Sequence, residues 1–155
     1  MASKFSGDII LDAGVVKDSN FSNSSSDRLT SSKQIHVVKA FTNFDLPIAS
    51  TPAAREEIVY VAPAAATVKL FRAMLNDTGT STSVTFDLKK NGVSILSGTI
   101  NITHSDSDRT VKDGSLSGTS LAADDVLSIQ LAVSSSTGAQ GPYAEVYIEE
   151  SGTPA

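Results

Sequence analysis

The dipeptide Asn91-Gly92 lies between two stretches in which apolar residues occur at every second position. Before it, Val84, Phe86 and Leu88 alternate with polar residues, and after it a second apolar stretch begins at Val93. A period of two is typical of a β-strand with one buried face. Asn-Gly accepts the positive φ angles of the type I′ turn that joins two such strands. The sequence therefore predicts an antiparallel β-hairpin at this point.

Other stretches with strand character follow the same pattern along the chain. Residues 126–133 and 142–150 alternate apolar and polar positions, and residues 58–61 are β-branched and aromatic. Residues 67–75 mix alternation with apolar doublets, and Gly98 indicates a bulge or a bend in the second hairpin strand. Short strands with turn signals at roughly 8- to 12-residue spacing are typical of a β-sandwich.

The predicted fold class is all-β, an antiparallel β-sandwich of the jelly-roll-like kind with an extended N-terminal arm. An immunoglobulin-like sandwich is less favoured, because the chain has neither tryptophan nor a cysteine pair. No stretch sustains the 3.6-residue period of a long helix. The best helix candidate is Thr51–Glu57, a single turn with threonine as its N-cap and Pro52 at the first helical position.

The N-terminal part of the chain is polar and rich in serine. We predict that residues 1–54 form the arm and residues 55–155 the sandwich domain. The stretch 17–34 buries too little apolar surface to offset the entropy of ordering it alone. The alternative is that residues 35–41 are the first strand of the sandwich, which would shorten the arm to about 30 residues.

The arm contains short apolar clusters for which no strand partner within the chain is evident. Such segments are expected to pair with a sheet edge on another subunit. The last predicted strand places two tyrosines on its outer face, and these either bind a subunit, pack beneath a loop or the arm, or stack on a sugar ring. The residues predicted to contact partners are Phe5, Ile9, Ile10, Leu11, Phe21, Leu29, Ile35, Val37, Phe41, Phe44, Tyr143 and Tyr147.

Composition and motifs argue against several classes of function. The net charge is −5 and no basic run exceeds two lysines, so nucleic-acid binding is not expected. There is no cysteine and no apolar stretch near the roughly 20 residues that span a membrane. The group His104-Ser-Asp106-Ser-Asp108 reads as a hydrated loop rather than a cation site, and Asp124-Asp125 as a turn cap. With only two histidines and no G-x-S-x-G elbow, we predict no enzyme, cofactor or small-molecule substrate.

One resemblance rests on two long stretches. Residues 75–100 read LNDTGTSTSVTFDLKKNGVSILSGTI, and residues 120–150 read SLAADDVLSIQLAVSSSTGAQGPYAEVYIEE. From Thr67 to Glu150 the chain resembles the small β-sandwich structural proteins of tailed bacteriophages, many of which are capsid decoration (cement) proteins. The segment before the sandwich looks like the connecting arm of those proteins.

The resemblance implies a virion structural protein, assembled in the host cytoplasm and located on the outer surface of the phage head. It would bind the major capsid protein through its arm, form a homotrimer, and stabilise the head without a catalytic site. An extended arm of about 50 residues at roughly 3.3 Å each would span more than 100 Å, enough to contact several neighbours.

Two alternatives remain open at this point. The first is a receptor- or carbohydrate-binding module of a tail fibre, which would use the loops at 76–83, 104–109 and 134–141 with Tyr143 or Tyr147 as stacking platforms. The second is a neck or tail adaptor joined to its neighbours through the same arm.

Overall fold

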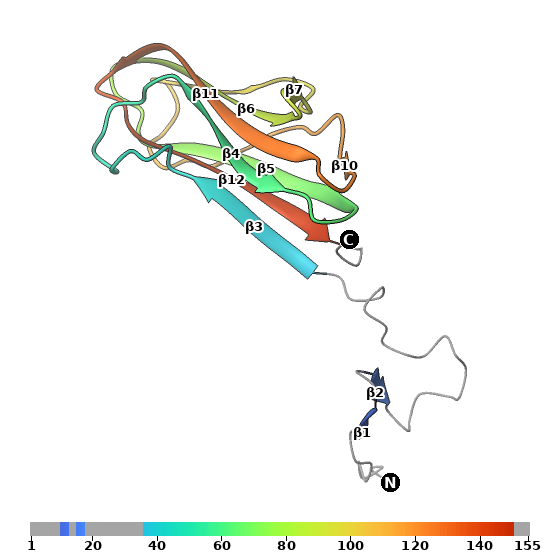
Figure 1. Cartoon of the computed structure of the whole chain (residues 1–155). Coiled ribbons are helices and arrows are strands. Elements are labelled where there is room, and N and C mark those ends of the chain that lie inside the picture. Colours follow the sequence, from blue (N-terminus) through green and yellow to red (C-terminus); the bar gives the residue numbers. More distant parts are fainter. Residues whose placement is uncertain (1–9, 13–14, 18–35, 151–155) are drawn as a thin grey trace, which may run out of the picture.

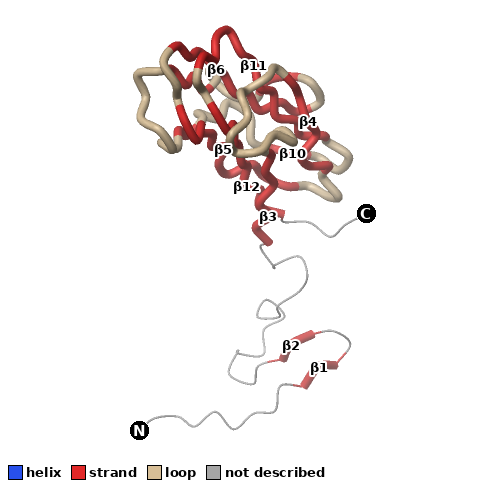
Figure 2. The backbone as a smooth tube through the Cα atoms, turned by 90° about the vertical axis from the view of Figure 1, so that its left-hand side faces the viewer, coloured by secondary structure: helices blue, strands red, loops and turns tan. Residues whose placement is uncertain are grey.

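The computed structural model describes residues 10–12, 15–17 and 36–150 (Figure 1). Within these residues every regular element is a β-strand, and no helix is present. Residues 36–150 form two antiparallel sheets that pack face to face, seen as two layers in Figure 2. The predicted antiparallel β-sandwich is confirmed.

The first sheet is built on three long strands. They are β3 (His36–Thr42), β12 (Gln140–Glu150) and β5 (Ala66–Asp77), in that spatial order. The short strands β9 (Lys112–Asp113) and β10 (Ser120–Leu121) both pair with β5. Among the described strands β3 has only β12 beside it, so it forms one edge of this sheet.

The second sheet has the same organisation. Its long strands are β4 (Arg55–Val61), β11 (Val126–Thr137) and β6 (Ser81–Lys90), in that order. The short strands β7 (Val93–Ser94) and β8 (Ile100–Thr103) both pair with β6. The strand β4 is the edge of this sheet on the side where β3 ends the first.

The strand pairs are nested along the chain, which identifies the sandwich as a jelly roll. The first strand of the sandwich, β3, pairs with the last, β12, and β4 pairs with β11. Within these, β5 pairs with β9 and β10, and β6 with β7 and β8. The pairings β5–β12 and β6–β11 then join the nested pairs into two sheets, the arrangement of a jelly roll.

The core lies between the sheets and contains the apolar residues that face inward from each. Phe86, Leu88 and Ile129 are fully buried from the second sheet, and Phe71 and Val146 from the first. Burying a side chain of this size contributes roughly 1.5–3 kcal/mol. The period of two read from the sequence therefore marks the buried face correctly.

The predicted Asn91-Gly92 hairpin is present. Asn91 and Gly92 have φ angles of 51° and 81°, as a type I′ turn requires, and the turn joins β6 to β7. The second arm of the hairpin is interrupted after Ser94, and β8 resumes the pairing with β6 at Ile100. The irregularity predicted at Gly98 lies in this interruption.

The boundary expected at residue 55 is wrong. The strand β3 pairs with β12 along its whole length, and Phe44 just beyond it is completely buried in the core. The sandwich therefore begins at His36, and the alternative that made residues 35–41 its first strand is close to the structure. Local sequence does not reveal this, because the partner strand lies at the other end of the chain.

Two smaller expectations are also corrected. Residues 51–57 contain no helical turn, because Arg55–Glu57 begin β4 and pair with β11. The apolar cluster in the arm has a partner within the chain, since β1 (Ile10–Asp12) pairs antiparallel with β2 (Val15–Lys17).

Candidate protein-binding face

The outer faces of the two sheets differ in chemistry. The second sheet presents polar side chains, such as Thr85, Asp87 and Gln130, from β6 and β11 on the face away from the core, while its edge strand β4 carries the exposed Ile58 and Val61. The outer face of the first sheet carries aliphatic and aromatic side chains on its three long strands. We call this surface the aromatic face, and it consists of Val37, Phe41, Leu70, Met74, Tyr143 and Tyr147.

Strand register brings these side chains onto one surface. Tyr143 on β12 lies opposite Met74 on β5, and Tyr147 lies opposite Leu70. The alternate residues of β12 point inward and are completely buried, so both tyrosines face outward. The outward placement predicted for Tyr143 and Tyr147 is confirmed, whereas their contact with a partner stays a prediction.

The edge strand contributes the most exposed part of the aromatic face. Val37 is 56% exposed and Phe41 is 59% exposed. The Phe41 ring stacks against Tyr143 with centroids 6.0 Å apart and an angle of 29° between the planes. The ammonium of Lys39 lies 5.4 Å from the Phe41 centroid, within the range of a cation–π interaction.

A small polar network fixes these aromatic side chains. Lys39 Nζ donates to Glu145 Oε2 at 3.2 Å, and the Tyr143 hydroxyl donates to the same oxygen at 2.9 Å. The hydrogen bonds to Glu145 and Tyr143 raise the pKa of Lys39. Burial alone would raise the pKa of Glu145, but the hydrogen bonds from Tyr143 and Lys39 outweigh it and the pKa falls. The carboxylate thus stays charged and ties β3 to β12.

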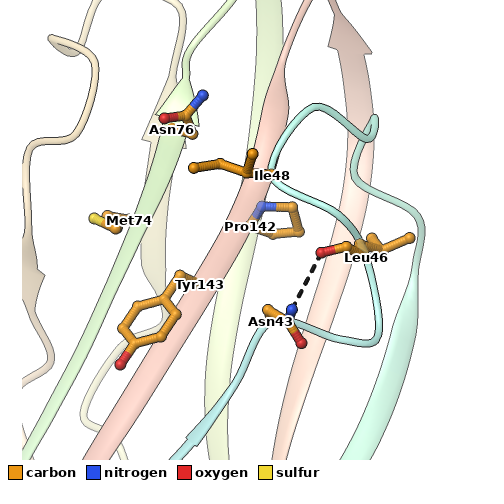
Figure 3. Close-up of a pocket in the computed structure, with 8 residues that line it drawn as sticks. Asn43, Leu46, Ile48, Met74, Asn76, Pro142 and Tyr143 are labelled. Carbon is orange, nitrogen blue, oxygen red and sulfur yellow. Dashed lines mark hydrogen bonds between the residues drawn. The ribbon is translucent and has the colours of Figure 1, made fainter.

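A pocket of about 200 Å³ lies beside Tyr143 at one end of the aromatic face (Figure 3). It is lined by Asn43, Leu46, Ile48, Met74, Asn76, Gly141, Pro142 and Tyr143. The two asparagines use only part of their hydrogen-bonding capacity. Asn43 Nδ2 donates to the Leu46 carbonyl at 3.3 Å, and Asn76 Oδ1 accepts from Arg109 at 3.0 Å. Within the described residues, Asn43 Oδ1 and Asn76 Nδ2 have no hydrogen-bond partner.

The turn that forms one wall of the pocket is strained. Phe44 and Asp45 have φ angles of 58° and 52°, a conformation that residues other than glycine rarely adopt. The turn is closed by a hydrogen bond from Leu46 N to Asn43 O at 3.1 Å. It has the two positive φ angles of a type I′ turn without glycine, which costs about 1–3 kcal/mol for each residue.

Packing and hydrogen bonds hold this turn in place. The Phe44 ring is completely buried, 6.0 Å from the ring of Phe86. Its amide donates to Thr42 Oγ1 at 2.7 Å, and its carbonyl accepts from the Arg55 guanidinium. These contacts stabilise the strained backbone, so the pocket is preformed.

The far wall of the pocket depends on a close backbone approach. Gly141 N donates to the Ser50 carbonyl at 2.9 Å, which attaches the loop after β3 to the start of β12. A Cβ atom on Gly141 would lie 2.5 Å from the Ile48 carbonyl oxygen. Only glycine fits here, since its φ is also +60°.

The acidic loop that follows β8 is held in place by hydrogen bonds and an ion pair to its neighbours. Asp106 accepts hydrogen bonds from the Thr103 amide at 2.8 Å and forms a 2.7 Å ion pair with Lys112. Asp108 accepts from the amide and hydroxyl of Thr78 at 2.8 and 2.9 Å. Both carboxylates are therefore occupied by protein donors, and the described residues contain no group of three or more side chains able to hold a metal ion.

The structure sorts the predicted partner-binding residues into distinct groups. Phe44 was assigned wrongly, because it belongs to the core. Ile10 and Leu11 lie in β1, while Val37 and Phe41 lie exposed on the edge strand. Tyr143 and Tyr147 face outward on β12, and the remaining residues lie outside the described part of the chain: Phe5, Ile9, Phe21, Leu29 and Ile35.

Several residues of the surface were missed from the sequence. Leu70 and Met74 belong to a stretch in which adjacent apolar residues do not show which side of the strand faces outward. No sequence pattern near Lys39 indicates that it lies on this surface. Ile48, which is 69% exposed at the rim of the pocket, lies in a loop without periodicity. Its exposure follows from the position of the loop against β12, which local sequence does not encode.

Among the described residues there is no helix that could cross a membrane. No protein-family model matches the chain, and no curated protein sequence matches it.

Proposed function

We propose that this protein is a structural component of a virion, a capsid decoration protein that binds the outside of the head. In this role the aromatic face and the N-terminal segment (residues 1–35) together contact neighbouring subunits. The partners are the major capsid protein and further copies of the chain, in a homotrimer. The resemblance of residues 67–150 to small sandwich proteins of tailed phages motivates the choice of partner.

The observation that carries the proposal is the exposure of Val37 and Phe41 on the strand that the N-terminal segment enters. Exposed aromatic and aliphatic side chains in one patch are typical of protein-binding surfaces. The charged residues Lys39 and Glu145 beside Phe41 are paired with each other, so contact with an apolar partner leaves neither charge unpaired.

The small area of the aromatic face explains why binding also needs the N-terminal segment. A stable interface buries about 800 Å² on each partner. Seven residues of β3 are at most about 25 Å long at roughly 3.4 Å per residue, and neighbouring strands lie about 4.8 Å apart. Three such strands therefore offer only a few hundred Å², so the N-terminal segment must supply much of the contact.

Binding to undecorated phage heads tests this function. We expect saturable, stoichiometric binding by the full chain, strongly reduced in Phe41→Asp and abolished by deletion of residues 1–34. Thr85→Asp on the outer face of the second sheet is the matched control and should bind like the unchanged chain. If Phe41→Asp and the deletion both bind as the unchanged chain does, the proposed interface is wrong.

A carbohydrate-binding role is the second candidate, favoured by the two asparagine amides at the pocket beside Tyr143. An aromatic ring with neighbouring amides suits the apolar face and hydroxyl groups of a sugar. A glycan array probed with the full chain separates the two functions. Binding that Asn76→Ala removes would favour this role over capsid decoration.

A further inference from the structure

The turn after β6 is anchored to the start of β11 by an asparagine side chain. The Asn91 backbone amide donates to the Val126 carbonyl at 2.9 Å, and the Val126 amide donates to Asn91 Oδ1, also at 2.9 Å. The side chain thus takes the place of a backbone carbonyl and continues the ladder between β6 and β11 by one position. Asn91 Nδ2 donates to Asp125 Oδ1 at 2.6 Å. Both polar atoms of the carboxamide are therefore hydrogen-bonded.

Asp125 is itself fixed by the turn at residues 122–125. Its Oδ2 accepts from the Ala122 amide at 2.8 Å and lies 3.7 Å from Lys90 Nζ. Lys90 Nζ also donates to the Ser120 carbonyl at 3.2 Å. Hydrogen bonds from the Ala122 amide and the Asn91 carboxamide lower the pKa of Asp125, so its side chain is a carboxylate that only accepts. The Asn91 carboxamide therefore connects the turn after β6 to the turn before β11.

An asparagine followed by glycine contains both partners of a covalent reaction. The glycine nitrogen attacks the asparagine Cγ and closes a succinimide ring, while Nδ2 takes the proton of the attacking nitrogen and leaves as ammonia. Water then opens the ring at either of its carbonyls, which gives aspartate or isoaspartate. Glycine favours the attack, because it has no Cβ to obstruct the approach of its nitrogen.

The structure leaves the attacking nitrogen at this turn free. Asn91 is the one asparagine of the sequence that precedes glycine, and both Asn91 and Gly92 are exposed to water. Among the described residues the Gly92 amide has no hydrogen-bond acceptor. Gly114, which follows Asp113, differs in this respect, since its amide donates to the Phe71 carbonyl at 2.9 Å. At the Asn91 turn only the carboxamide is restrained.

We propose that Asn91 is a deamidation site that the folded chain keeps unreacted through Asp125 and Val126, and that its conversion separates the two turns. The nitrogen that must leave is the atom that donates to Asp125, so the reaction requires this hydrogen bond to break. In the aspartate product an oxygen replaces Nδ2, 2.6 Å from the Asp125 carboxylate, and like charges replace a hydrogen bond. In the isoaspartate product the main chain runs through Cγ, and the longer backbone no longer fits a type I′ turn.

Peptide mapping of the full chain by mass spectrometry, after incubation in mildly alkaline buffer, tests the inference. We expect Asn91 to deamidate at least about tenfold more slowly in the folded chain than in urea, because breaking one hydrogen bond costs about that factor. Asp125→Ala, shown to be folded by circular dichroism, should deamidate severalfold faster than the unchanged chain. Ser94→Ala is the matched control, since it removes a 2.6 Å hydrogen bond to Asp87 in the same hairpin and should leave the rate unchanged.

The effect of the product is measured separately. Asn91→Asp reproduces the aspartate product and should lower the thermal unfolding midpoint. Combining it with Asp125→Asn exchanges the two side chains, so that the amide at position 125 donates to the carboxylate at position 91. The amide oxygen at position 125 can still accept from the Ala122 amide. The double variant should therefore recover most of the stability that Asn91→Asp loses.

Several outcomes would overturn the inference. These are equal rates of deamidation in the folded chain and in urea, an Asp125→Ala variant that reacts no faster than the unchanged chain, and an Asn91→Asp variant of unchanged stability. The comparison with urea needs no variant, so it holds even if Asp125→Ala does not fold. Binding to phage heads plays no part in these measurements, and the capsid role and this inference can fail independently.

Discussion

The ring of Phe44 packs against the ring of Phe86 across the two sheets, with centroids 6.0 Å apart. Both side chains are completely buried, and Phe44 occupies its place with a φ angle of 58°. The contact fastens the loop after β3 to the core and thereby sets the position of the pocket wall.

Phe44→Ala should be strongly destabilising. Truncating a buried phenylalanine costs about 3–5 kcal/mol of unfolding free energy, because transfer energy is lost and a cavity remains. Phe41→Ala, three residues earlier on the exposed face, should cost about 1 kcal/mol or less. Urea unfolding of both variants measures the difference, and equal losses would contradict the assignment of Phe44 to the core.

Asp45 allows the strain in the turn to be measured separately. Its φ of 52° suits glycine better than aspartate, so Asp45→Gly should stabilise the protein by up to about 1 kcal/mol. Asp45→Val should destabilise it by about 1–2 kcal/mol, since a β-branched side chain tolerates this conformation least. Thermal unfolding midpoints should rank Gly above Asp above Val. Another order would show that the turn is not held in the left-handed region.

Gly141→Ala should disrupt the contact between the loop and β12. The new methyl group would meet the Ile48 carbonyl oxygen at 2.5 Å and would also face the penalty of a positive φ, for a loss of more than about 2 kcal/mol. Gly98→Ala is the control, because no atom lies within 4 Å of its added Cβ. It should leave stability unchanged or raise it by about 0.4–1 kcal/mol. Chemical unfolding of the two variants measures both changes in unfolding free energy. A small loss for Gly141→Ala would contradict the close contact between Gly141 and the Ile48 carbonyl.

Acid should weaken the hydrogen bonds that hold the loop after β8. Hydrogen bonds from the Thr78 amide and hydroxyl lower the pKa of Asp108. Because the folded pKa lies below the unfolded value of about 3.9, this contribution is present above pH 4 and is lost as pH falls through the folded pKa. Unfolding free energies measured from about pH 6 to pH 2.5 should fall less steeply in Asp108→Asn than in the unchanged chain. If the unfolding free energy falls equally steeply with pH in both proteins, Asp108 does not contribute to the acid sensitivity.

The sequence predicted the elements whose signals are local. The alternation of Val84, Phe86 and Leu88 and the Asn91-Gly92 turn were enough to define a hairpin and its buried face. A strand with one face in the core shows its orientation in its own residues, and a type I′ turn favours particular side chains. The outward placement of Tyr143 and Tyr147 followed from the same rule.

The pairing of β3 with β12 and the shape of the pocket depended on the tertiary structure alone. Lys39 and Glu145 are 106 residues apart, and nothing near either one in the sequence indicates that they meet. Phe44 follows a polar segment and looked like part of the arm, yet it lies in the core. The physical reason is that side-chain alternation reports which face of a strand is buried, whereas the choice of neighbouring strand depends on how the whole chain wraps around its core.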